Sequence, residues 1–185
     1  MCSAPHLTAE TRGDGGHQTV SVRIVLLTGA PGAGKTTVLT ALMDLLEADD
    51  VQYAAIEMEA LALVHPLPDD DAAFQHIEFV AESFRDRGYP RLLVSATIED
   101  NEYLRRLLAA LPSDDVLIVR LDAPPDLLHA RLTVREPPGW VGLPRLLTAA
   151  DRLAKSIAAL PRVDVVLSTV DTDPNALAAT IRDAM

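Results

Sequence analysis

The sequence has little of what a disulfide framework, an aromatic core or a membrane span requires. Its single cysteine, Cys2, can form neither an internal disulfide nor a cysteine-based zinc site. No apolar run approaches the roughly 20 residues of a membrane-spanning helix. Aromatic residues make up only 4% of the chain, whereas hydrophobic residues make up 49%. The core is therefore predicted to be aliphatic, as in proteins with buried parallel strands.

Positive charge is also scarce, since 16 lysines and arginines stand against 27 acidic residues and the net charge is -11. Such a surface repels nucleic acids and anionic lipids. We therefore expect neither a nucleic acid polymer nor a membrane as a partner. Residues 1–21 are polar and lack the basic and apolar regions of a secretory signal. They are predicted to be a disordered tail before one domain, residues 22–185, of a cytoplasmic protein whose oligomeric state the sequence does not indicate.

Short apolar runs alternate with longer amphipathic stretches along that domain. The runs predict strands, and the stretches, with apolar residues at helical spacing, predict helices. Alternation of this kind favours right-handed crossovers and a parallel sheet covered on both faces. The predicted fold is a three-layer α/β sandwich with five strands, over residues 22–27, 51–56, 91–95, 116–121 and 163–167. The main predicted helices cover residues 34–48, 72–87, 100–111, 143–160 and 174–185, with a further helix opening at residues 124–126.

One motif lies between the first predicted strand and the first predicted helix. Its residues are Gly29, Ala30, Pro31, Gly32, Ala33, Gly34, Lys35 and Thr36, followed by Thr37. They match the pattern G-x-x-x-x-G-K-[ST], in which glycines let backbone N–H groups approach an anion at a helix N-terminus. In this pattern Lys35 reaches the β- and γ-phosphates of ATP, and the Thr36 hydroxyl binds Mg²⁺. The alternatives are a tight glycine-rich turn with an incidental lysine, and a dinucleotide-binding turn, whose glycines have a different spacing.

With this motif, the chain after its tail resembles the small P-loop kinases of the nucleoside monophosphate kinase-like group, which includes shikimate, gluconate and chloramphenicol kinase-like members. The resemblance implies the strand order 2-3-1-4-5 and a mobile lid after the fourth strand. It also implies ATP and Mg²⁺ as cofactors and a small-molecule acceptor. No single member of the group is identified.

The resemblance places the acceptor beside the end of the second strand. Glu57 there is the candidate base or acceptor-orienting carboxylate, and Glu59 a second contact; alternatively both are solvated acids that open a helix. The third strand ends without the aspartate that many P-loop proteins carry. Ser95 and Thr97 either line the site or only cap the helix that begins near Asp100. The helix over residues 72–87 and the loop before it are expected to shape the acceptor pocket.

Arg131 and Arg135 stand one helical turn apart before the predicted lid, residues 136–142. By resemblance, Arg135 contacts the transferred phosphoryl group, and Arg131 contacts adenine or the α- and β-phosphates. The alternative is a surface pair bridged to acids such as Asp126 or Glu136. Trp140 either covers the site or anchors the following helix.

Two hypotheses for the function follow from these residues. The first is an ATP-dependent phosphotransferase in which Lys35, Glu57 and Arg135 act on a metabolite, nucleoside or nucleotide. The second is a non-catalytic or slow ATP-binding module that acts as a switch, which the missing aspartate and the short lid favour.

Overall fold

The computed structural model of the protein describes residues 21–61, 65 and 70–185. Five parallel strands form one sheet in the order β2-β3-β1-β4-β5, which confirms the predicted order. The strands are β1 (Arg23–Thr28), β2 (Ala54–Glu57), β3 (Arg91–Ala96), β4 (Val116–Asp122) and β5 (Val165–Ser168). The helices are α1 (Lys35–Ala48), α2 (Met58–Leu61), α3 (Asp70–Asp86), α4 (Asn101–Ala109), α5 (Pro125–Arg135), α6 (Leu143–Ala158) and α7 (Pro174–Ala184).

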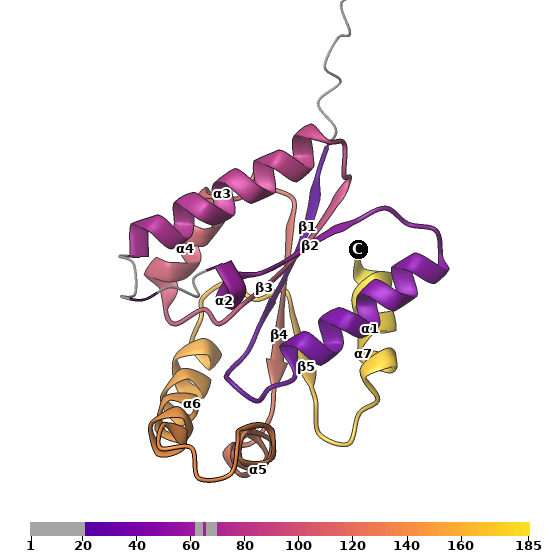
Figure 1. Ribbon diagram of the computed structural model, residues 1–185. Helices are drawn as coiled ribbons and strands as arrows, with labels where there is room; N and C mark the ends of the chain where they lie inside the picture. The colour runs from indigo at the N-terminus through magenta and orange to yellow at the C-terminus, as the bar shows by residue number, and fades with distance from the viewer. Residues whose placement is uncertain (1–20, 62–64, 66–69) are drawn as a thin grey trace, which may run out of the picture.

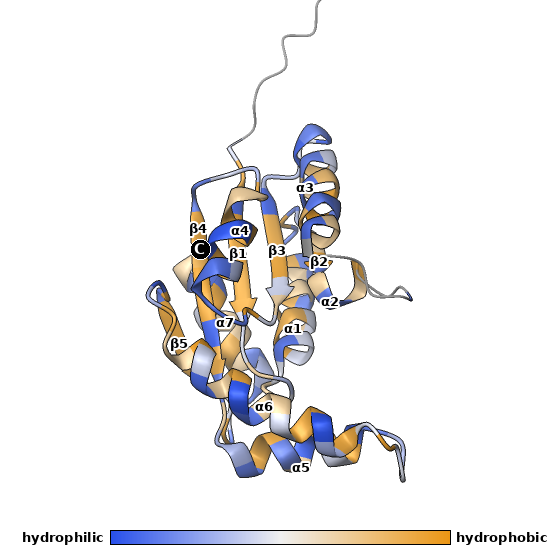
Figure 2. Cartoon of the chain, turned by 90° about the vertical axis from the view of Figure 1, so that its left-hand side faces the viewer, coloured by the Kyte–Doolittle hydropathy of each residue, from blue (hydrophilic) through white to orange (hydrophobic). Residues whose placement is uncertain are grey.

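The helices cover both faces of the sheet, so the fold is the predicted three-layer sandwich. Figure 1 shows α3, α4 and α6 on one side of the sheet, with α1 and α7 on the other. Successive side chains of β1 alternate between these layers: Ile24 and Leu26 pack with α3 and α4, whereas Val25 and Leu27 pack with α1 and α7. The inner strands β1, β3 and β4 are buried on both faces and are nearly continuous hydrophobic runs, drawn largely orange in Figure 2. The edge strand β5 alternates between half-buried and exposed residues.

Two local features differ most from the sequence-based expectation, and β5 also begins at Val165 rather than Val163. The second strand begins at Ala54 rather than Val51, because the Val51 N–H donates to Leu46 O at 2.8 Å and completes the C-terminal cap of α1. Asp50 allows this with a left-handed φ of 53°. The short helix α2 directly follows β2 and was not predicted as a separate element.

The structure does not test the predicted tail or the predicted location of the protein. The predicted tail falls almost entirely on residues 1–20, which lie outside the described residues. Within the described part of the chain, no helix combines the length and the apolar character that crossing a bilayer requires. The cytoplasmic location and the division into tail and domain stay predictions.

Candidate functional site

The turn between β1 and α1 has the geometry of an anion cradle. Gly34 precedes α1 with a φ of 98° and provides no side-chain cap for the helix. The first N–H groups of α1 therefore have no capping side chain and are available to an anion, which the helix dipole also favours. A Cβ on Gly29 would lie 2.7 Å from Leu121 O, so the turn can approach β4 only with glycine at this position.

The ammonium group of Lys35 lies inside this turn. Its Nζ donates to Gly29 O at 3.0 Å and to Thr97 Oγ1 at 2.8 Å, and it lies 3.7 Å from Glu59 Oε1. The side chain is only 11% exposed. Burial lowers the pKa of Lys35, the Glu59 carboxylate opposes this effect, and the charge of Arg135 adds to it. The site thus contains a buried cation that an incoming anion would stabilise.

A carboxylate anchors Lys35 from the neighbouring strand end. Glu59 lies in α2, and its Oε1 accepts hydrogen bonds from Thr97 N at 2.9 Å and Thr97 Oγ1 at 2.6 Å. Thr97 directly follows β3 and joins Lys35 to Glu59. The structure therefore brings Thr97 into the cavity rather than into a helix cap, because Asp100 itself caps α4 by accepting from Tyr103 N at 2.8 Å.

Glu57 occupies the last position of β2, paired in register with Ser95 of β3. Its Oε1 is buried and has no hydrogen-bond partner among the residues that the structure describes. A buried carboxylate oxygen without a partner is costly. An oxygen of this kind at a cavity wall is suited to a donor that arrives with a ligand, such as a hydroxyl group.

The two arginines of α5 have different environments. Arg131 is held between the glycine turn and the loop after β5, because it donates to Gly32 O at 3.2 Å and to Thr169 Oγ1 and O at 2.9 and 2.7 Å. Arg135 is 59% exposed and pairs with Glu136 at 2.6 Å. Its environment thus matches both the expected position at the cavity and the alternative of a surface ion pair.

One cavity of about 840 Å³ joins these groups. Its walls come from the glycine turn, the start of α1, the ends of β2 and β3, α5, and the loop after β5. The lining residues predicted from the sequence are Pro31, Gly32, Gly34, Lys35, Thr36, Thr37, Glu57, Glu59, Ser95, Thr97, Arg131 and Arg135. The structure adds Thr169 and Thr172 of the loop after β5 and Pro174 at the start of α7. Val38, Leu132, Leu146 and Leu177 add an apolar wall that no motif in the sequence indicates.

Some expected residues lie outside this cavity. Ala30 and Ala33 face a second, smaller cavity of about 350 Å³ beside α6, so only their backbone is available to a phosphate on the other side. Among the described residues, α3 contributes nothing to the larger cavity, and most of the loop before α3 lies outside the described residues. The Trp140 ring lies against Gly142 at the start of α6, is 43% exposed and is not part of the described lining.

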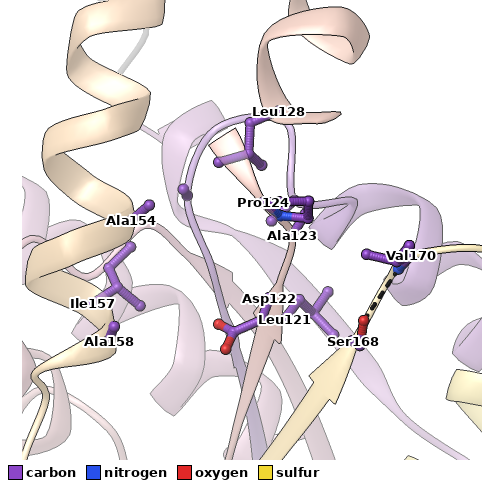
Figure 3. Close-up of a pocket in the computed structure, with 12 residues that line it drawn as sticks. Leu121, Asp122, Ala123, Pro124, Leu128, Ala154, Ile157, Ala158, Ser168 and Val170 are labelled. Atoms are coloured by element: carbon purple, nitrogen blue, oxygen red, sulfur yellow. Dashed lines mark hydrogen bonds between the residues drawn. The ribbon is translucent and has the colours of Figure 1, made fainter. Parts of the chain in front are cut away.

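The smaller cavity has a different chemical character, shown in Figure 3. Ala154, Ile157 and Ala158 of α6 form one wall, opposite Ser168 and Val170. Its one charged lining residue among those described, Asp122, already receives two hydrogen bonds from Arg120, at 2.9 and 3.0 Å. The charged and polar groups expected to bind a nucleotide therefore lie in the larger cavity.

Comparison with known proteins agrees with this geometry. A family profile described as an AAA domain matches residues 24–159, which include the glycine turn, both carboxylates and both arginines of the larger cavity. The chain belongs to this AAA domain family. Among curated proteins, no match was found.

Comparison with solved structures shows that this AAA-domain chain has the fold of small kinases. The Mycobacterium tuberculosis APS kinase CysC, in complex with AMPPNP and APS, is 18% identical, with a TM-score of 0.59 over 88% of this chain and 96% of that one. Shikimate kinase from Acinetobacter baumannii, in complex with shikimate, is 20% identical, with a TM-score of 0.53 over 89% and 93%. A gluconokinase from Sinorhizobium meliloti 1021 is 19% identical, with a TM-score of 0.53 over 90% and 97%. The resemblance to small P-loop kinases is thereby confirmed at the level of the fold.

Proposed function

We propose that the protein is an ATP-dependent phosphotransferase that moves the γ-phosphoryl group of ATP to a hydroxyl group of a small molecule. The observation that carries this proposal is that one cavity contains both a glycine turn around a buried lysine and a buried carboxylate oxygen that has no partner among the described residues. The first can hold a triphosphate, and the second can receive a proton from an acceptor. The kinase fold of the structural neighbours supports the same assignment.

In this proposal the nucleotide lies between the glycine turn and the loop after β5. The N–H groups at the start of α1 and the Lys35 ammonium hold the β- and γ-phosphates. The Arg131 guanidinium, already fixed against Gly32 O and Thr169 O, borders the side on which the base and the α-phosphate bind. Its planar fork suits both stacking and phosphate binding.

The residues around the turn also fit a Mg²⁺ ion. The Thr36 hydroxyl lines the cavity beside the glycine turn, and oxygen groups are the ligands that Mg²⁺ prefers. The described residues contain no group of three or more His, Cys, Asp and Glu side chains arranged to hold a metal. This agrees with an ion held mainly by phosphate oxygens, as is usual for Mg²⁺ in kinases. When bound, Mg²⁺ would neutralise charge on the transferred phosphoryl group.

Transfer then requires an acceptor hydroxyl between Glu57 and the γ-phosphate. The hydroxyl oxygen forms a bond to the γ-phosphorus while the bond to the bridging oxygen breaks, and ADP keeps that bonding pair. The hydroxyl proton passes to Glu57. Arg135 at the cavity wall stabilises the negative charge of the moving group after exchanging its Glu136 partner for phosphate oxygens.

The test is ADP production from ATP and Mg²⁺ over a panel of alcohols, sugars, nucleosides and nucleotides, with Lys35→Ala as the blank. Glu57→Gln is expected to leave ATP affinity within about threefold and to lower transfer by about 100-fold or more. Glu78→Gln, on the exposed face of α3, is the matched control and should behave as wild type. If ATP binds but no acceptor raises turnover above the blank, the alternative of a non-catalytic ATP-binding switch replaces this proposal.

A further inference from the structure

The charges of the larger cavity are distributed unevenly between its two ends. Among the described residues, three cationic side chains line it, those of Lys35, Arg131 and Arg135, and two carboxylates, those of Glu57 and Glu59. A bound triphosphate brings more negative charge than one Mg²⁺ ion neutralises. The cations of the described lining exceed its carboxylates by only one, which does not cancel the remaining negative charge of the nucleotide. The cavity with bound nucleotide therefore keeps a net negative charge.

All three cations are placed for the nucleotide rather than for the acceptor. Lys35 is bonded to Gly29 O inside the glycine turn. Arg131 is bonded to Gly32 O and to Thr169 on the side of the loop after β5. Arg135 pairs with Glu136 and, in the proposed transfer, exchanges this partner for oxygens of the transferred phosphoryl group. No described cation of the lining is thus left to recognise a negatively charged acceptor.

The strand ends on the acceptor side offer the opposite charge. Within the described part of the chain, Glu57 presents a buried carboxylate oxygen without a partner. Glu59 lines the same cavity and is 51% exposed, and the hydrogen bonds from Thr97 and the ion pair with Lys35 involve only its Oε1. Ser95 and Thr97 add hydroxyl groups but no charge. This end of the cavity can accept hydrogen bonds from ammonium and hydroxyl groups, and it repels carboxylates and phosphates.

The sequence that forms the acceptor side is also poor in positive charge. No lysine or arginine occurs between Lys35 and Arg85, a stretch that includes β2, α2 and most of α3. Of the arginines in the neighbouring helices α4 and α6, Arg106 pairs with Asp71 and stacks on Phe74, and Arg152 lies 3.3 Å from Glu99. Arg145 of α6 is exposed and is not part of the described lining. The described lining itself therefore offers an anionic acceptor no further counter-charge.

We infer that the acceptor is a positively charged hydroxyl compound, an amino alcohol or amino sugar. Its ammonium group is held by Glu59, while Glu57 takes the proton of the hydroxyl group that receives the phosphoryl group. This inference rests on the proposed phosphotransfer and adds the charge class of the substrate. Like charges brought together at a binding site disfavour a ligand by several kcal/mol. Anionic acceptors should thus be worse by about 100-fold or more in kcat/KM.

The test compares acceptors that share a scaffold and differ in charge. Glucosamine, glucose and glucuronate form one such set, and an aminocyclitol, its uncharged cyclitol and the cyclitol phosphate form another. ADP production is measured for each compound with ATP and Mg²⁺, against the Lys35→Ala blank. The expected order is cationic above neutral above anionic. Preference for an anionic member overturns the inference while phosphotransfer stands, whereas no transfer to any compound overturns the proposed function and this inference with it.

A charge-neutral variant separates recognition of charge from a general loss of activity. Glu59→Gln keeps an oxygen that can accept from Thr97 N and Oγ1 but removes the negative charge. The ratio of kcat/KM between the cationic and the neutral acceptor should fall about tenfold, mainly through the KM of the cationic acceptor. Glu59→Asp should restore most of the ratio, and Glu78→Gln should leave it unchanged. An unchanged ratio in Glu59→Gln would show that this carboxylate does not select the acceptor.

Discussion

Replacing Gly34 with alanine tests the phosphate cradle with a control built into the fold. Gly34 has a φ of 98°, and a Cβ added there would meet none of the described residues other than its chain neighbours within 4 Å. Gly88, at the C-terminal end of α3, has a φ of 83° and equally open surroundings. The two alanine variants should therefore have the same backbone strain and no steric clash within the protein. They differ in that Gly34 lines the larger cavity and Gly88 does not.

The size of both effects follows from these positions. A left-handed backbone costs a residue with a Cβ about 1–2 kcal/mol relative to glycine. For a domain of this size, each kcal/mol lowers the melting temperature by about 2–4 °C. Both variants should lose a similar amount of stability. Only Gly34→Ala places a methyl group where phosphate oxygens would bind, and losing one charge-assisted hydrogen bond, about 1.5–3 kcal/mol, weakens ATP binding at least about tenfold.

The assay is thermal unfolding with and without ATP, together with calorimetric titration of ATP. Gly88→Ala should melt earlier than wild type but gain the wild-type increment of stability from ATP. Gly34→Ala should melt at a similar temperature to Gly88→Ala and gain much less from ATP. Equal ATP affinity in the two variants would refute the reasoning, because the triphosphate would then not lie against this turn.

Three further predictions concern the cations of the cavity. Lys35→Met should raise the melting temperature of the nucleotide-free protein, because it removes a buried charge, and should abolish stabilisation by ATP; unchanged ATP stabilisation would contradict it. Burial lowers the pKa of Lys35 below 10.5, so burying the charge costs the folded protein stability at pH values below the lowered pKa. This cost disappears as the pH rises from the lowered pKa toward 10.5. In this pH range the free energy of unfolding of the wild type, relative to that of Lys35→Met, should rise while ATP affinity falls; chemical unfolding and ATP titration at several pH values measure both. Arg131→Lys should weaken ATP binding about tenfold, since one ammonium cannot replace the hydrogen bonds to Gly32 O and both Thr169 oxygens; calorimetry with Arg145→Lys, an exposed change outside the cavity, is the comparison.

The arrangement of the fold could be predicted because each element leaves a local pattern in the sequence. Buried strands such as β1 are short aliphatic runs, and the helices that cover them have apolar residues at helical spacing. Strand ends were less predictable. Val51 is apolar and β-branched, yet its N–H closes the cap of α1 because Asp50 turns the chain. A sequence pattern does not reveal whether such a residue belongs to the end of the preceding helix or to the start of the following strand.

The candidate site divides in the same way. The glycine turn and Lys35 form one contiguous motif, so the sequence reveals them directly. The contacts that hold Lys35 come from residues far apart in the chain: Thr97 lies 62 positions from Lys35 and 38 from Glu59. They meet only because β2 pairs with β3 and β3 with β1 in the observed register. A contact that depends on the register of two strand pairs has no local signal.

This register also bears on the choice between an enzyme and a passive ATP-binding module. The sequence lacks an aspartate directly at the end of β3, and this absence favoured the passive alternative. In the structure a carboxylate nevertheless lies there, because Glu59 reaches across from α2 and accepts hydrogen bonds from the backbone and the hydroxyl of Thr97. Negative charge at the end of β3 is thus provided by the neighbouring segment rather than by β3 itself. The missing aspartate therefore no longer argues against phosphotransfer, and the acceptor panel, rather than any single motif, decides between the two functions.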